Sequence, residues 1–330
     1  MREYNHLSFL DQVNLFELRG MTIEDKGKAE QKLRFISYYK LKELAYPFYI
    51  KKEGEMQYTN ISFDTLIKRY YQDKRLRTSI LYCLEKIEVA FKTRFGYQLG
   101  NRHGAYGYLN FSNWCNKEEY CKHYISEKQG VFKKDLKDKA HLYKNRCIDD
   151  HFNKNPELNK DPTKIPIWML VEVMTFGEVL QLYKLMSNKN RESISNEFKC
   201  TPTELESWLN GLKFARNKCA HNANVIDLKL KTKTKLRNEW KKYIYIETKN
   251  NQSTGGLSDI IIPMVHLTTI INESFQFNEI QKAINTIVDR DDESAIKFGF
   301  ANAHASVHAI SDMGGHFKQN YNSKQTKNRL

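Results

Sequence analysis

The chain has few of the residues that interrupt helices. Only 15 of its 330 residues are glycine and six are proline, whereas average proteins contain roughly 7% glycine and 5% proline. Because both residues mark turns, their scarcity favours long helices over many turns. Apolar residues make up 40% of the chain and charged residues 28%, a composition typical of globular rather than disordered proteins.

Several chemistries are absent from the sequence. The six cysteines include no Cys-x-x-Cys pair, which is typical of reduced, mostly buried thiols rather than of a disulfide framework or a zinc site. His304 and His308 have the spacing of a metal-binding pair, but no third ligand is evident. The chain also lacks a glycine-rich phosphate loop and an arguable Ser-His-Asp arrangement. We therefore expect neither a metal nor a cofactor.

Long hydrophobic runs are also missing. No apolar run approaches the ~18–20 residues needed to cross a bilayer. Residues 1–10 are polar and lack the apolar centre of a signal peptide. We expect a cytoplasmic protein that does not enter the membrane.

Positive charge is abundant. Fifty-three lysines and arginines face 39 acidic residues, which gives a formal net charge of +14. This balance favours a polyanionic partner such as RNA, although a basic protein can also be merely soluble. After the centre of the chain, cations recur with a period of two at Lys229, Lys231, Lys233, Lys235 and Arg237. Such a period predicts one charged face of an extended strand, which either follows a phosphate backbone or guards a sheet edge.

One short stretch combines three useful side chains. Arg216 is followed by Asn217 and Lys218, and His221 comes five positions after the arginine. The planar fork of an arginine can hold a phosphate, and an imidazole can move protons near neutral pH. An amide can orient either group. Together they can cut RNA without a metal, whereas the alternative is that Arg216 only forms a structural ion pair.

A long amphipathic helix is predicted from about Asp73 to Tyr97. Its apolar stripe follows the 3.6-residue period and consists of Leu76, Ile80, Leu84, Ile87 and Phe91. Glu88 falls at the edge of that stripe. It is either a surface residue with an ion-pair partner or a carboxylate held near an active site.

A second helix is expected to run without a break from Pro166 to Met186, buried on all sides. Glu172 falls in its apolar stripe, so it needs a partner. A third helix begins with the capping box from Thr201 to Glu204 and places Arg216 in its apolar stripe. We therefore predict that Glu172 is buried and pairs with Arg216 or with another cation.

The angle between Arg216 and His221 raises a further question. On an ideal helix these two side chains lie about 140° apart. Either the helix ends or distorts near Cys219, or the two side chains converge only at a surface shared with a second copy.

Three regions follow from these patterns. Residues 1–58 form an amino-terminal helical region, residues 59–245 the core, and residues 246–330 a carboxy-terminal helical region with a polar tail from about Lys318. Within the core, residues 112–165 are rich in charge and are predicted to be an irregular insertion.

The chain resembles the Abi-like bacterial abortive-infection proteins of the AbiD/AbiF type, whose motif end belongs to the HEPN superfamily of helical ribonucleases. The early matching segments are Leu18–Met21, Ile36–Leu41, Tyr46–Phe48, Ile61–Phe63, Asp73–Arg77 and Leu84–Glu88. The later ones are Ile165–Met169, Glu172, Thr175–Gly177, Leu212 and Arg216–Asn222.

The resemblance implies an all-α fold with a HEPN-like helical-bundle core. It also implies metal-independent RNA cleavage, in which His221 acts as general base or acid and Arg216 stabilises the phosphate. Members often act as toxins that stop growth during phage infection, and some are encoded beside a structured noncoding RNA that restrains them. One motif per chain implies a site composed at the two-fold interface of a homodimer.

Overall fold

A computed structural model describes residues 6–52, 55–138 and 144–313. The described chain is predominantly helical, and the sheets within it are two antiparallel two-stranded pairs. The expected all-α class is therefore confirmed. The polar tail predicted from about Lys318 lies outside the described residues.

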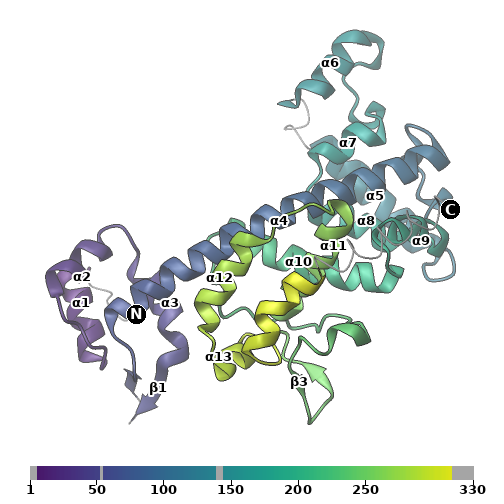
Figure 1. The fold of residues 1–330 in the computed structure, drawn as a ribbon. Coiled ribbons are helices and arrows are strands. Elements are labelled where there is room, and N and C mark those ends of the chain that lie inside the picture. The colour runs from purple at the N-terminus through teal and green to yellow at the C-terminus, as the bar shows by residue number, and fades with distance from the viewer. Residues whose placement is uncertain (1–5, 53–54, 139–143, 314–330) are drawn as a thin grey trace.

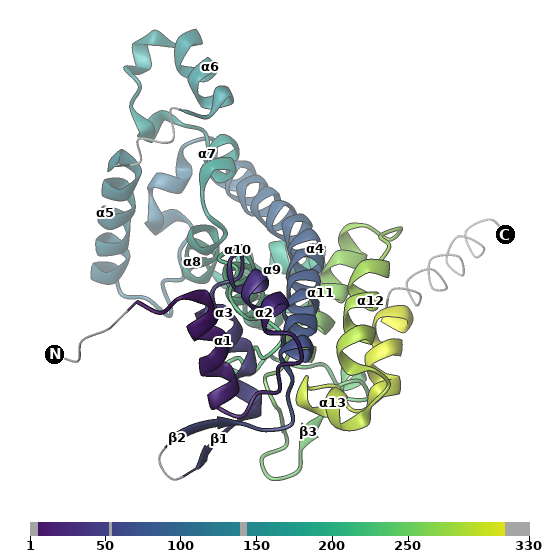
Figure 2. The same cartoon turned by 90° about the vertical axis from the view of Figure 1, so that its left-hand side faces the viewer.

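The amino-terminal region consists of short helices followed by a hairpin. Its elements are α1 (Phe9–Leu18), α2 (Lys26–Leu33), α3 (Tyr38–Ala45), η1 (Tyr46–Phe48), β1 (Tyr49–Lys52) and β2 (Glu55–Tyr58). Pro47 lies in η1, where the helical run ends. The hairpin of β1 and β2 was not expected (Figure 2).

Helix α4 (Phe63–His103) is the long axis of the molecule, and the other regions lie along it (Figure 1). The hydroxyl of Ser62 caps it by accepting a hydrogen bond from the Thr65 amide. The predicted helix from Asp73 to Tyr97 lies wholly within α4. All five side chains of its predicted stripe are buried, namely Leu76, Ile80, Leu84, Ile87 and Phe91.

The motif helix and the three helices before it pack against α4. They are α7 (Ile167–Val173), α8 (Phe176–Leu185), α9 (Asn188–Ser195) and α10 (Pro202–Ala220). The prediction of one helix from Pro166 to Met186 is wrong, because the backbone is extended at Met174 and Thr175. Thr175 and Glu178 form a capping box that starts α8, and this box satisfies backbone groups that a continuous helix would have used.

The charged insertion is more regular than predicted. Residues 112–165 contain α5 (Lys122–Asp138) and α6 (Arg146–Lys154), and α6 projects away from the rest of the molecule in both views (Figures 1 and 2). The insertion also contains the short 3-10 helices η5 (Pro156–Leu158) and η6 (Pro162–Lys164), and η3 (Phe111–Asn113) lies at its start. Elsewhere in the chain, 3-10 helices occur at η2 (Gly107–Leu109), η7 (Asn196–Phe198) and η8 (Asn238–Trp240). The expectation of an irregular segment is therefore wrong. Apolar side chains such as Ile148 and Phe152 are too sparse to show a period but are buried.

The carboxy-terminal region contributes to the same core. It contains β3 (Ile246–Glu247), β4 (Gln252–Ser253), α11 (Ser258–Ile271), α12 (Asn278–Val288) and α13 (Asp292–Lys297), and residues 303–313 are also helical. Every residue of α11 from Ser258 to Thr269 is buried, and the helix contacts α4 and α10. Of the helices described, none is long and apolar enough to span a bilayer.

Candidate functional site

Arg216 lies on the last turns of α10 and faces α4. Its Nε atom is 3.3 Å from Oε2 of Glu88, while Oε1 of the same carboxylate is 3.1 Å from Nζ of Lys92. The Glu88 side chain is 14% exposed and that of Arg216 is 38% exposed. In the described structure no partner is recorded for the two terminal nitrogens of Arg216. One carboxylate therefore fixes the arginine by its Nε edge and leaves its other donors available.

The predicted pairing of Glu172 with Arg216 is wrong. Glu172 lies on the last turn of α7, its side chain is exposed, and it makes no ion pair with any described residue. The prediction that Glu172 is buried assumed one continuous helix, whereas α7 ends at Val173. Trp168, one turn earlier on the same predicted stripe, is likewise 51% exposed. Of the two candidate carboxylates, Glu88 is the one that contacts the motif.

A cavity of about 410 Å³ lies beside Arg216. It is bordered by Leu81, Tyr82, Glu85, Glu88, Val89, Lys92 and Arg216. The exposed side chains of Tyr82 and Val89 give it an apolar side, while Arg216 and Lys92 supply two cations and Glu85 and Glu88 two carboxylates. An anionic group attached to an apolar or aromatic body would bind at the donors of Arg216 that Glu88 does not contact.

His221 ends the motif helix. The last residue of α10 is Ala220, and the His221 amide donates to the carbonyl of Asn217 at 3.0 Å. Both side chains, those of His221 and Asn217, are exposed. The helix therefore ends close to Cys219, which is one of the two alternatives that the sequence left open. His221 does not line the cavity beside Arg216, so a single copy does not bring the two side chains into one pocket.

A buried ion pair on α4 anchors the segment that follows His221. Asp73 is fully buried, and its Oδ1 accepts hydrogen bonds from the amides of Val225 and Ile226 at 2.8 and 3.0 Å. Its Oδ2 accepts from Nε of Arg77 at 2.9 Å, and Arg77 donates in turn to the side-chain oxygen of Asn222 at 2.7 Å. Asn222 has a left-handed backbone with φ of 53°.

Sequence reasoning gave these residues no role. Asp73 and Arg77 are four residues apart and border the stripe of Leu76 and Ile80. This spacing alone indicates an ion pair within one helix. Their partners beyond His221 were not visible, because they lie about 150 residues away in the chain.

The lysine tract after the motif forms no strand in the described structure. Burial follows a period of two only in part: Leu228, Leu230 and Thr234 are buried and Lys229, Lys231 and Lys235 are exposed, but Thr232 is exposed as well. The tract forms no β-ladder with another described segment, although the Leu230 amide donates to the carbonyl of Gly255 at 2.7 Å, so the expected charged face of a strand is wrong. Two of the ammonium groups have internal partners: Lys229 donates to the carbonyl of Lys297 at 3.2 Å and Lys235 to the hydroxyl of Thr203 at 2.8 Å.

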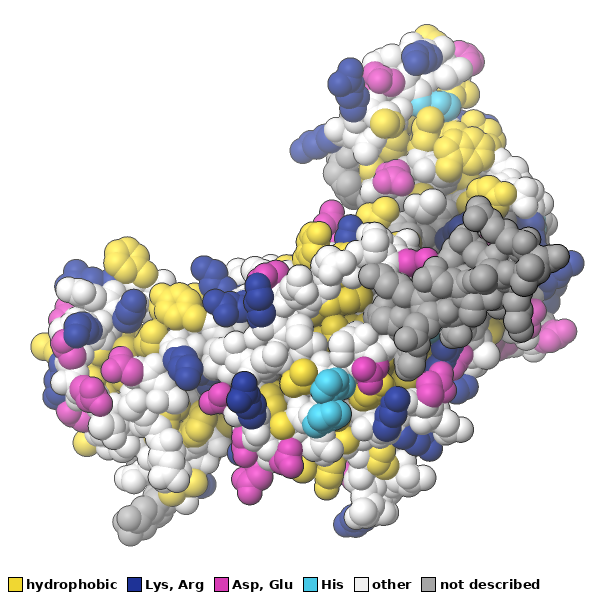
Figure 3. Space-filling model, in the orientation of Figure 1, with side chains coloured by type: hydrophobic (Ala, Val, Ile, Leu, Met, Phe, Trp, Pro, Cys, Tyr) yellow, Lys and Arg dark blue, Asp and Glu magenta, His cyan; other side chains and the backbone are white. Residues whose placement is uncertain are grey.

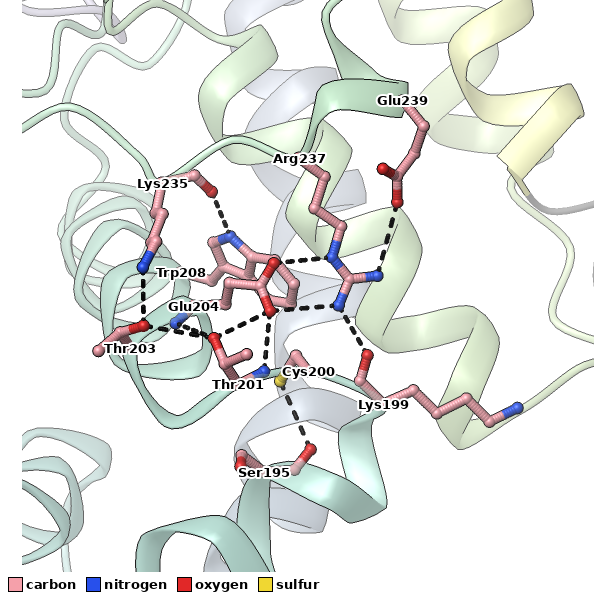
Figure 4. Close-up of polar contacts among 10 residues, drawn as sticks. All are labelled: Ser195, Lys199, Cys200, Thr201, Thr203, Glu204, Trp208, Lys235, Arg237 and Glu239. Atoms are coloured by element: carbon pink, nitrogen blue, oxygen red, sulfur yellow. Dashed lines mark hydrogen bonds and ion pairs between the residues drawn. The ribbon is translucent and has the colours of Figure 1, made fainter. Parts of the chain in front are cut away.

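Arg237 belongs to a structural network (Figure 4). Its Nε is 3.0 Å from Glu204, the capping-box carboxylate of α10, and its Nη2 donates to the carbonyl of Lys199 at 2.6 Å. The guanidinium also lies 5.0 Å from the ring centre of Trp208. These contacts engage most of its donors at the start of the motif helix.

The remaining sequence features are distributed over the surface and the core. Basic and acidic side chains are interspersed on the face shown in Figure 3 rather than gathered into one patch. The rings of His304 and His308 stack with centroids 3.9 Å apart, and the described residues contain no group of three potential metal ligands. All six cysteines are free thiols, and burial raises the pKa of Cys83, Cys115, Cys200 and Cys219 to about 12.

Comparison with protein-family models matches residues 31–227 to the Abi-like protein family. The chain belongs to this family. The match covers more than half of the 330 residues. No curated protein and no solved structure gives a match.

The Abi-like segment contains both helices that form the candidate site, α4 and α10. It includes α4 with Asp73 and Glu88, the motif at the end of α10, and the anchored turn as far as Asp227. The lysine tract and helices α11 to α13 lie beyond it. Chemically, this segment offers a guanidinium, an imidazole and an amide, a set that can perform acid–base chemistry at a phosphate.

Proposed function

We propose that this Abi-like protein is a metal-independent endoribonuclease toxin of a bacterial anti-phage system and acts in the cytoplasm. The observation that carries the proposal is the arrangement of Arg216. Glu88 holds its Nε at 3.3 Å, and the rest of the exposed guanidinium borders a cavity of about 410 Å³. An arginine placed in this way is suited to hold a phosphate through its free edge.

The proposed reaction follows the chemistry of RNA. The ribose 2′-hydroxyl loses a proton and attacks the adjacent phosphorus, the bond to the 5′-oxygen breaks, and that oxygen gains a proton. The products end in a 2′,3′-cyclic phosphate and a 5′-hydroxyl. His221 moves the protons, and Arg216 stabilises the charge on the pentacoordinate phosphorus. Asn217 orients the side chain of either His221 or Arg216. Glu88 acts as a positioning residue for Arg216.

A second copy would complete the site. His221 ends α10 outside the cavity that contains Arg216. At the border of that cavity, the side chains of Tyr82 and Val89 are 57% and 55% exposed, so they are available for an interface. A homodimer through this motif face would cover them. It would also bring the histidine of one copy towards the arginine of the other.

The restraining partner in this proposal is a structured noncoding RNA. Contacts would come from the accessible lysines of the motif and the following tract, namely Lys218, Lys229, Lys231, Lys233 and Lys235. Arg237 is left out of this set because Glu204 and the carbonyl of Lys199 bind most of its donors. Lys229 and Lys235 each make one hydrogen bond within the protein and keep further donors on the ammonium group. Since each neutralised phosphate releases counterions, binding should weaken steeply with salt.

The lysine contribution can be measured directly. Replacing Lys231, Lys233 and Lys235 together by glutamine should reduce the salt dependence of binding by about two to three phosphate contacts. Unchanged binding at every salt concentration would place the RNA on another surface.

The catalytic proposal is tested with purified wild type and the variants His221→Ala and Arg216→Ala. Each variant should lose toxicity and RNA cleavage, and EDTA should not affect the wild type. Sequencing of the cleaved ends should show cyclic phosphates. Cleavage that requires an added divalent metal would overturn the mechanism.

A second candidate is a non-catalytic RNA-binding protein that forms a stable ribonucleoprotein. It is favoured by the separation of His221 from the Arg216 cavity within one copy. In that case the wild type and His221→Ala would bind the noncoding RNA equally well, and neither would cut any RNA.

A further inference from the structure

A separate cavity of about 410 Å³ lies where α7 crosses α4. Its walls include Tyr97 and Asn101 of α4, and Trp168 and Glu172 of α7. Two helical glycines, Gly96 and Gly100, also line it. The site is distinct from the cavity beside Arg216, and the proposed cleavage reaction does not use it.

Trp168 is held in place by one of these glycines. A Cβ atom added at Gly100 would lie 3.2 Å from Cε3 of the indole, so the ring rests directly on the helix backbone. Yet 51% of Trp168 is exposed, whereas Trp114, Trp208 and Trp240 are at most 3% exposed. Tyr97 beside it is 62% exposed. Fixed, accessible aromatic rings are ready-made platforms for stacking an unpaired base.

Glu172 supplies the charged group among the residues that line this cavity. It follows Trp168 by one helical turn, and no described residue forms a hydrogen bond or ion pair with its carboxylate. A carboxylate offers two acceptor oxygens and no donor, and it therefore selects a ligand with two adjacent donors.

We propose that this cavity binds an unpaired guanine base of the RNA partner, an inference that rests on the proposed function only in taking RNA as the ligand. Guanine stacks on Trp168 and Tyr97, and its N1–H and N2–H groups donate to the two oxygens of Glu172. Adenine and cytosine each offer a single amino group on that edge. Uracil offers one donor between two acceptors, which the carboxylate repels.

The position of the cavity fits a role in choosing RNA sequence. Val89 borders the Arg216 cavity and Gly96 borders this one. Seven residues of helix separate them by about 10 Å and return to the same face of α4. A strand whose phosphate lies at Arg216 therefore places a nearby base at Trp168. In a cleaving enzyme, the cavity would favour guanine at a fixed offset from the cut.

Binding can be tested without cleavage in the His221→Ala background. The probes are fluorescent oligouridylates that contain a single central guanosine, adenosine or cytidine, or none. We expect the guanosine probe to bind about tenfold more tightly than the all-uridine probe. Glu172→Gln should remove that preference while leaving all-uridine binding unchanged, and Glu157→Gln, an exposed glutamate of η5, should keep it.

Trp168→Leu tests the stacking platform. It should lower guanosine binding by about tenfold and spare the all-uridine probe. Equal binding of all four probes, or a preference that survives Glu172→Gln, would overturn the assignment. So would a Trp168 fluorescence response to tetramethylammonium but not to guanosine monophosphate, which would indicate a cation site. If Trp168→Leu dissociates a dimer and leaves the base preference intact, the face is instead an interface between copies.

The outcome for the nuclease is separate. A guanosine preference in a protein that cuts no RNA would support the guanine site and contradict the proposed nuclease activity. Cleavage of RNA with no base preference at any distance from the cut would support the nuclease activity and contradict the guanine site. A chain that binds no RNA at all would overturn both.

Discussion

Among single residues, Glu88 determines the orientation of the Arg216 guanidinium and which of its nitrogens stay accessible. Its carboxylate binds Arg216 at 3.3 Å and Lys92 at 3.1 Å, so it sets the orientation of one cation and balances two. Since it contacts only the Nε edge of the guanidinium, it leaves the terminal nitrogens to a ligand. The same negative charge must also repel a phosphate that approaches the arginine.

Glu88→Gln should therefore separate turnover from affinity. We expect kcat for RNA cleavage to fall, because Arg216 loses its fixed orientation, while KM stays the same or decreases because a repelling charge is gone. The cost in stability should be only about 1 kcal/mol. Steady-state kinetics on one RNA substrate measures both constants.

The control for this variant is Glu85→Gln, which removes a carboxylate from the same cavity border without touching an ion pair recorded in the described structure. It should lower KM slightly and leave kcat unchanged. Equal losses of kcat in both variants would show that Glu88 has no special role in positioning.

His266 supplies a pH-dependent contribution to stability. It lies on α11 at 4% exposure, with its ring 5.2 Å from that of Trp208 and 5.4 Å from that of Trp240. Burial lowers the pKa of His266 to about 3. Below its ordinary value of about 6.5, the unfolded chain takes up a proton that the folded chain refuses. Stability should therefore fall as the pH decreases from about 6.5 towards 3.

This effect should reach about 2 kcal/mol at pH 5. Urea unfolding at pH 7 and pH 5 should show a larger loss of free energy for the wild type than for His266→Phe, which keeps an aromatic ring but cannot titrate. The variant also loses the hydrogen bond between His266 and the backbone of Phe198, which lowers the free energy of unfolding equally at both pH values. The same acid-induced loss in both proteins would rule out His266 as its source.

At the scale of elements, the Asp73–Arg77 pair joins α4 to the turn that follows the motif. Asp73 is fully buried and accepts two backbone hydrogen bonds from that turn. Asp73→Ala would leave the Arg77 charge buried without its partner, which typically costs about 3–5 kcal/mol. We expect a clear decrease in Tm, measured by calorimetry or circular dichroism.

Asp73→Asn keeps an acceptor oxygen for the turn and should cost less than the alanine variant. Glu85→Ala, an exposed carboxylate of the same helix, should melt like the wild type. If Asp73→Ala also does so, the pair does not anchor the turn.

Local patterns predicted the elements well where the deciding interactions are local. The capping box at Thr201 and Glu204 occurs as expected, because it is formed within four residues. The lysine tract shows the limit of such patterns. A period of two predicts the burial of Leu228, Leu230 and Thr234 but not the exposure of Thr232. A strand also requires a neighbouring strand, which the tract itself does not specify.

The site could be predicted in part for the same reason. Arg216, Asn217 and His221 stood out as a set, and Glu88 was recognised at the edge of its stripe. Glu172 was misplaced because a second capping box, at Thr175 and Glu178, divides the helix that was expected to bury it. The contact between Asp73 and the turn after His221 could not be predicted, since only the packing of α10 on α4 creates it.

At the scale of the whole molecule, the question is whether one copy or two forms the site. Within one copy, Arg216 borders a cavity that His221 does not line. The side chains of Tyr82 and Val89 border the same cavity as the arginine and are more than a third exposed. A two-fold interface there is self-complementary, so each of two equivalent sites would take its arginine from one copy and its histidine from the other.

Co-expression of Arg216→Ala and His221→Ala chains distinguishes the two arrangements. In a mixed dimer with composite sites, one site carries both substitutions, and the other has an intact arginine from the His221→Ala chain and an intact histidine from the Arg216→Ala chain. Differently tagged chains, purified together through both tags, should therefore regain about half of the wild-type cleavage rate per dimer. Each homodimer should remain inactive. Val89→Arg added to both chains should abolish the recovery and yield monomers in sedimentation, because it places a charge at the interface. Mixed dimers that stay inactive would mean that each copy uses its own arginine and histidine.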